Sequence, residues 1–63
     1  MNKMKTILVP QDGASEFDIS DFDVVPTMGE KVALKGRSYE VSNIINDYDN
    51  WVVQMMLSPL SNS

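Results

Sequence analysis

Carboxylates that crowd into one short stretch are the residues with the clearest chemical potential in this chain. Asp12, Glu16, Asp18, Asp21 and Asp23 occur with no Lys or Arg between them, so the stretch carries a charge of −5. The rest of the chain carries +1, which gives the net charge of −4. A concentrated negative surface attracts a basic partner and speeds association with it. We therefore predict that Glu16, Asp18, Asp21 and Asp23 bind a partner.

Apolar residues interleave with these acids and support a second interpretation. Phe17 and Ile19 alternate with polar neighbours, as in a half-buried strand, and Phe22 and Val24 continue the alternation in the opposite phase. In this interpretation the four apolar side chains are core and the acids only form a solubilising outer face. A strand cannot change its buried face without a break, so we expect an irregularity at Ser20–Asp21.

The residue types needed for most catalytic and metal chemistry are missing from the sequence. With 0 Cys and 0 His, the chain can form neither a disulfide nor an ordinary zinc site. A Ser or Thr nucleophile would also lack its usual base. A calcium loop that began at Asp47 would need Gly at its sixth position and Glu at its twelfth, where the sequence has Val52 and Ser58. We expect a protein that is not an enzyme and uses no cofactor or metal.

The last apolar run offers a second contact surface. Alternation predicts that Trp51, Val53, Met55 and Leu57 share one face of a strand. Val52 and Met56 then project from the opposite face. Methionine suits adaptable contact surfaces, and a strand that is apolar on both faces is either central in its sheet or covered on its outer side. We predict that Val52 and Met56 contact a partner protein or a second copy of the chain.

Cationic residues around one predicted hairpin suggest a different class of function. Lys31, Lys35 and Arg37 could gather around this hairpin, with Tyr39, Tyr48 or Trp51 available to stack on a base. The net charge of −4 opposes approach to a phosphate backbone. The lysines also suit the solvated face of a strand at a sheet edge. A nucleic-acid-binding barrel therefore stays an alternative, and nucleic acid is not the partner we expect.

The elements that must position these residues are short strands joined by tight turns. The patterns predict strands over 3–9, 17–24, 31–34, 38–46 and 51–57, ended by turn residues such as Pro10, Gly36 and Pro59. In the fourth strand Tyr39, Val41 and Ile45 share one face, and Ile44 breaks the alternation through a bulge or burial on both sides. A competing interpretation places a short helical turn over 14–21, since Ser15 and Asp18 resemble a capping pair.

These elements predict an all-β fold. We expect a small five-stranded SH3-like barrel or a curled antiparallel sheet. Residues 1–60 form a single domain and 61–63 a flexible tail. No apolar run approaches the roughly 20 residues of a membrane helix, so no membrane association is expected.

The C-terminal half carries a wider pattern of turns and inward residues. It runs Pro26-x-x-Gly29-Glu30-x-Val32-x-Leu34-x-Gly36-x-x-Tyr39-x-Val41, followed by Asp47-Tyr48-Asp49 and a Val-containing strand that ends at Pro59. This pattern, which covers about 34 residues, resembles small uncharacterised proteins encoded by bacteriophages. The resemblance implies an SH3-like fold and a phage or prophage setting. It implies no catalytic residues.

Together these observations favour a small phage-type protein-binding module. It would inhibit or redirect a host protein, such as one of a defence or transcription complex, by occluding it with an acidic surface and an apolar patch. The expected location is the host cytoplasm. The alternative is a structural virion or assembly component that forms homo-oligomers and resides in the virion.

Overall fold

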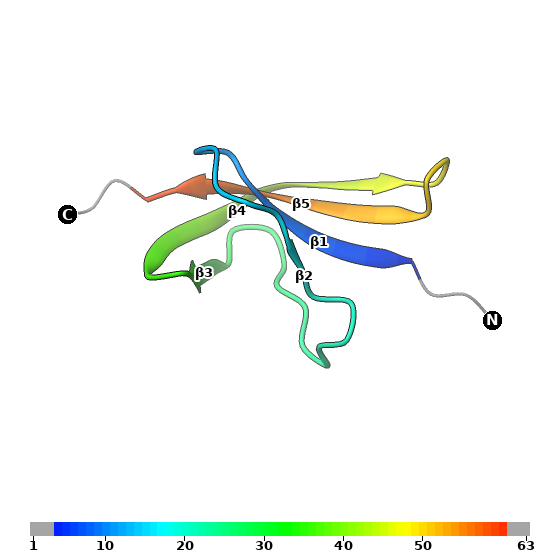
Figure 1. The fold of residues 1–63 in the computed structure, drawn as a ribbon, viewed down its shortest axis with the longest axis horizontal. Helices are drawn as coiled ribbons and strands as arrows, with labels where there is room; N and C mark the ends of the chain where they lie inside the picture. The colour runs from blue at the N-terminus through cyan, green and yellow to red at the C-terminus, as the bar shows by residue number, and fades with distance from the viewer. Residues whose placement is uncertain (1–3, 61–63) are drawn as a thin grey trace.

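Five strands make up the fold in the computed structural model, which describes residues 4–60. They are β1 (Lys5–Pro10), β2 (Phe17–Asp18), β3 (Lys31–Leu34), β4 (Arg37–Asp47) and β5 (Val52–Pro59), and they form one sheet in the order β2-β1-β5-β4-β3 (Figure 1). No helix occurs among the described residues. The predicted all-β class with five strands is confirmed.

The predicted helical turn over 14–21 is wrong, because this stretch pairs with β1 instead. Phe17 and Asp18 are β2, with Cα partners Leu8 and Ile7 in β1. The next backbone N–H, that of Ile19, donates to the Thr6 carbonyl at 2.9 Å. Backbone groups held in this ladder are not free for i→i+4 bonds, so the segment stays extended until the turn at Ser20–Asp21.

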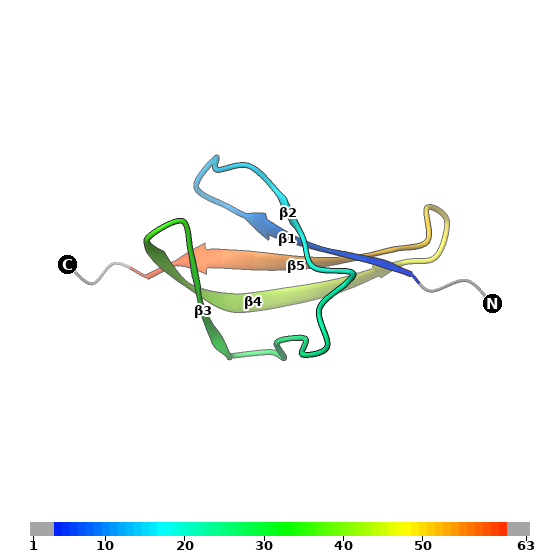
Figure 2. The same cartoon turned by 60° about the horizontal axis from the view of Figure 1, so that its bottom comes forward.

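The sheet is mixed and curls into a half-barrel consistent with a small SH3-like barrel (Figures 1 and 2). The β1–β2, β3–β4 and β4–β5 pairs are antiparallel, whereas β1 and β5 run parallel. The first predicted alternative, an SH3-like barrel, therefore agrees with the structure, whereas the curled sheet is mixed and not antiparallel throughout. Pairing of the first and last strands places β1 beside the central strand β5, and it leaves β2 and β3 as the two edges.

Alternate residues of the strands meet in one apolar core on the inner side of the curl. Its buried members are Leu8, Ile19, Tyr39, Val41, Met55 and Leu57, and Phe17, Val32, Leu34, Ile44 and Val53 pack against them. Leu57 is 0% exposed and lies opposite Val41 in β4 and Pro10 in β1. The core thus joins strands from both ends of the sequence.

A β-bulge in β4 decides which of its apolar residues face this core. The register with β5 shifts between Val41 and Asn43, so one residue of β4 has no partner. After the bulge Ile44 lies opposite Met55 on the inner face, and Ile45 lies opposite Gln54 on the outer face. The predicted bulge is confirmed. The predicted inward position of Ile45 is wrong, because the extra residue reverses the alternation.

Turns with positive φ close the two hairpins. Lys35 (φ 54°) and Gly36 (φ 81°) form the two-residue β3–β4 turn, with the backbone of a type I′ turn. Trp51 (φ 60°) ends the β4–β5 turn, where its ring lies 6.3 Å from that of Tyr48. Trp51 is 46% exposed. Its predicted place on the buried face of the last strand is wrong, because the strand begins one residue later.

Candidate functional site

The predicted acidic site extends along β2 and the connection that follows it. Asp18 lies in β2, Glu16 lies just before it, and Asp21 and Asp23 lie in the segment that leads toward β3. All four residues are exposed. Ser20, through its hydroxyl and then its backbone N–H, lowers the pKa of Asp18 from its ordinary value. Asp18 therefore stays charged near neutral pH, and all four acids face solvent.

The apolar residues among these acids do not all enter the core. Ile19 is buried and Phe17 is half-buried, but Phe22 is 55% exposed and Val24 is 78% exposed. The interpretation that places all four in the core is therefore wrong for the last two. β2 ends at Asp18, and the turn at Ser20–Asp21 directs the chain away from β1. Phe22 keeps one aromatic contact, with its ring centroid 6.1 Å from that of Phe17 in an edge-to-face arrangement.

The outer side of the sheet carries a group of apolar residues with Gln54 among them. Register partners share a face of a sheet, and Ile7 aligns with Gln54 and Ile45, while Val9 aligns with Met56. We call this surface the outer face; its apolar residues are Ile7, Val9, Ile45, Val52 and Met56. Ile45 is exposed and the other four are half-buried. The residues that complete the core lie on the opposite side of the sheet.

Register also brings one predicted acid onto the outer face. Asp18 is the partner of Ile7, so it borders the apolar residues at the β2 edge. Its carboxylate lies 4.0 Å from the Lys5 ammonium, in an exposed pair. The structure therefore unites Asp18, Val52 and Met56, three of the six predicted site residues. Asp21, Asp23 and Glu16 lie outside the paired strands.

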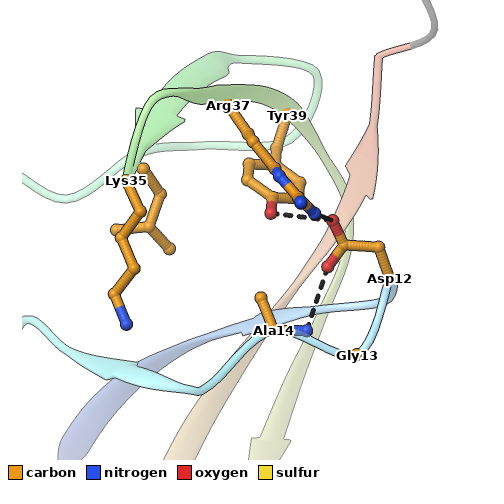
Figure 3. A pocket seen from close by; sticks show the side chains of 7 residues that line it. Asp12, Gly13, Ala14, Lys35, Arg37 and Tyr39 are labelled. Atoms are coloured by element: carbon orange, nitrogen blue, oxygen red, sulfur yellow. Dashed lines mark hydrogen bonds and ion pairs between the residues drawn. The ribbon is translucent and has the colours of Figure 1, made fainter.

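A second site lies where the β1–β2 turn meets the β3–β4 hairpin. It is a pocket of about 400 Å³. Its lining comprises Asp12, Gly13, Ala14, Leu34, Lys35, Arg37 and Tyr39. Figure 3 shows the Arg37 and Tyr39 side chains reaching toward Asp12, with Lys35 on the other side of the opening. No residue of the outer face belongs to it.

Asp12 ties the walls of this pocket together. One carboxylate oxygen accepts from the Tyr39 hydroxyl at 2.9 Å and from Arg37 Nη1 at 3.1 Å. The other accepts from the Ala14 backbone N–H at 3.1 Å (Figure 3). Tyr39 itself is 1% exposed, so the carboxylate satisfies a hydroxyl at the margin of the core. This contact fixes the first turn against the second hairpin.

These contacts shift the titration of the groups involved. Hydrogen bonds from the Ala14 N–H and the Tyr39 hydroxyl, together with the Arg37 guanidinium, hold the pKa of Asp12 below its ordinary value of 3.8. Burial, and then the bond to Asp12, raises the pKa of Tyr39 above 10.0. Asp12 is therefore ionised and Tyr39 is neutral across the physiological range.

The Asp12 contact should make stability depend on acid pH. Folding lowers this pKa, so the stabilisation is complete above the unfolded value near 3.8 and is lost as pH falls through the folded pKa. We expect urea unfolding midpoints measured between about pH 6 and pH 2 to fall less steeply for Asp12→Asn than for the wild type. At neutral pH the variant should be the less stable of the two.

Asp23→Asn is the matched control, because it removes an exposed carboxylate that takes part in no ion pair among the described residues. Its midpoints should follow those of the wild type. If Asp12→Asn retained the full acid dependence, Asp12 would not be the group responsible.

Sequence patterns did not reveal this second site. Asp12 and Tyr39 lie 27 residues apart, and Asp12 stands in what reads as an ordinary Asp-Gly turn. The structure also removes one of the rings that the nucleic-acid alternative proposed for base stacking. Tyr39 is buried and bonded to Asp12, so it cannot stack on a base.

Comparison with protein families, with curated proteins and with solved structures found no match. Within residues 4–60, no group of three or more acidic side chains is arranged to hold a metal ion. No helix in this range has the length and apolar character needed to cross a membrane.

Proposed function

We propose that this chain is a protein-binding module that occludes a surface of another protein with its outer face. The observation that carries the proposal is the group of apolar side chains on the side of the sheet opposite the core, which surrounds Gln54. Ile7, Val9, Val52 and Met56 lie on two adjacent parallel strands, and Ile45 extends the surface onto β4. Contiguous apolar surface outside the core of a small protein marks an interaction site.

Charge at the border of the outer face indicates the chemistry of the partner. Asp18 lies at the β2 edge, and Asp21 and Asp23 continue the negative charge along the connection that follows. A partner with an apolar patch bordered by Lys or Arg would complement both features. In the phage setting that the resemblance implies, the partner would be a host protein, and binding would inhibit or redirect it.

Met56→Asp tests the apolar contribution. It places a charge on the outer face, beside Val9, without touching the core, and it should reduce partner binding at least tenfold. Ala33→Asp is the matched control, since it introduces the same carboxylate at an exposed position of β3. Tagged wild type and both variants would be compared by quantitative capture from host lysate, and then by titration of the purified partner. Equal binding by Met56→Asp and wild type would contradict the proposal.

The acidic contribution is tested on the same purified partner. Neutralising Asp18, Asp21 and Asp23 together should slow association and reduce its dependence on salt, while dissociation changes little. Unchanged association kinetics would show that Asp18, Asp21 and Asp23 do not contribute to partner binding.

A homo-oligomer is the second candidate, because the same apolar surface could meet its own copy. Sedimentation over micromolar concentrations distinguishes the two candidates. A dimer that Met56→Asp dissociates and Ala33→Asp does not would support assembly through the outer face. A monomer at all concentrations would exclude it.

A further inference from the structure

The pocket between the β1–β2 turn and the β3–β4 hairpin has a charge opposite to that of the whole chain. Its ionisable walls are Asp12, Lys35 and Arg37, so two cations face one anion. Asp12 already accepts three hydrogen bonds, including one from Arg37. The Lys35 ammonium forms no ion pair with any residue in 4–60. One positive charge therefore remains uncompensated at the pocket.

Arg37 also retains donors that can serve a ligand. Its Nη1 binds Asp12, and a guanidinium has five N–H donors in a fixed plane. The side chain is 68% exposed, so part of this plane faces solvent. Lys35 approaches from the opposite side of the opening, held there by the positive-φ backbone of its turn (Figure 3). A ligand between them would meet donors from two directions.

The other residues that line the pocket favour a ligand with an apolar part as well as a negative charge. Leu34 and Ala14 supply aliphatic surface beside the cations, and Leu34 also packs against the core. The volume of about 400 Å³ lies in the range of small-molecule sites. The net charge of −4 and the exposed acids after β2 disfavour a polyanion. A single anionic head on a short apolar stem fits these walls best.

We propose that this pocket binds the carboxylate of a small aliphatic acid. The carboxylate lies between the Lys35 ammonium and the free donors of Arg37, and the aliphatic stem lies against Leu34 and Ala14. Asp12 does not contact the ligand as a charge partner; it positions Arg37 and joins the two turns. This site is independent of the outer face, because the two share no residue.

Backbone amide chemical shifts during titration with butyrate test the proposal. We expect saturable shifts concentrated at Gly13, Ala14, Lys35 and Arg37, with a dissociation constant on the order of 10 mM. Acetate should bind about threefold or more weakly, because it lacks two methylenes. Butyramide, which has a similar stem without the charge, should give no saturable shift. Sodium chloride at equal ionic strength provides the baseline.

Lys35→Asn removes the cation while favouring the fold. Asn adopts positive φ more readily than Lys, and Asn-Gly is a preferred type I′ pair. The variant should therefore be at least as stable as the wild type and should bind butyrate about tenfold more weakly. Lys31→Gln is the control, because it removes an exposed lysine of β3 outside the pocket, and it should bind as the wild type does.

Three outcomes would overturn the proposal. The first is the absence of saturable shifts with butyrate up to about 100 mM. The second is equal butyrate affinity in Lys35→Asn and Lys31→Gln. The third is tighter binding of inorganic phosphate than of butyrate, which would show that Leu34 and Ala14 do not contribute to ligand selectivity. None of these outcomes bears on partner binding by the outer face.

Discussion

Replacing Leu57 with alanine should lower the free energy of unfolding by about 3–4 kcal/mol. Leu57 is 0% exposed at the centre of the core, where strands from both ends of the chain meet. The substitution removes buried methyl groups and leaves a cavity that three paired strands cannot collapse to fill. A 63-residue domain has a total stability of about 3–9 kcal/mol, so the variant should lose about a third or more of its stability.

Urea unfolding followed by far-UV circular dichroism would measure this loss. Met56→Ala is the matched control, because it shortens the neighbouring side chain on the half-buried outer face. Its cost should be about 1 kcal/mol or less. Similar losses for Leu57→Ala and Met56→Ala would show that the two faces of β5 are equally covered, which would contradict the assignment of the outer face.

The second large effect concerns the bulge in β4. Ile44→Asp should destabilise the fold by more than about 3 kcal/mol, because it places a carboxylate against the core beside Met55. Ile45→Asp should cost about 1 kcal/mol or less, since this side chain is 42% exposed on the outer face. Two adjacent isoleucines thus serve as controls for each other.

Thermal and urea unfolding of both Ile variants would show which of the two isoleucines faces the core. A larger loss for Ile45→Asp would mean that the alternation continues through Ser42 without a bulge. The pair also separates folding from function: Ile45→Asp should remain folded and lose binding through the outer face, which capture with the purified partner would detect.

Much of this fold could be predicted because it depends on local features. Strand periodicity, Gly and Pro turns and the absence of Cys and His indicated an all-β domain without zinc or disulfide chemistry. The β3–β4 hairpin lies where Lys35-Gly36 predicted a reversal, since the turn conformation depends on those two residues alone. The bulge near Ile44 was also visible, as a break in alternation. Val52 and Met56 were placed opposite the core by the same period of two.

The errors occurred where a local pattern continues but its pairing partner does not. Phe22 and Val24 alternate like strand residues, yet β2 ends at Asp18, and the turn at Ser20–Asp21 leads the chain away from β1. Ile45 and Trp51 follow the apolar pattern of their strands, yet a bulge and a turn direct them outward. The alternation of apolar residues predicts which way a side chain points within a strand. It does not predict where the pairing between two strands ends.

By itself, the sequence determined that this protein is a small acidic all-β domain with apolar residues on both faces of its last strand. Only the tertiary structure decided what those residues meet. The parallel pairing of β1 with β5 joins Val52 and Met56 to Ile7 and Val9 in one surface. The curl of the sheet brings Asp12 to Tyr39 and Arg37 across 25 to 27 residues and so creates the cationic pocket. Both sites depend on non-local strand pairing, which local residue patterns do not specify.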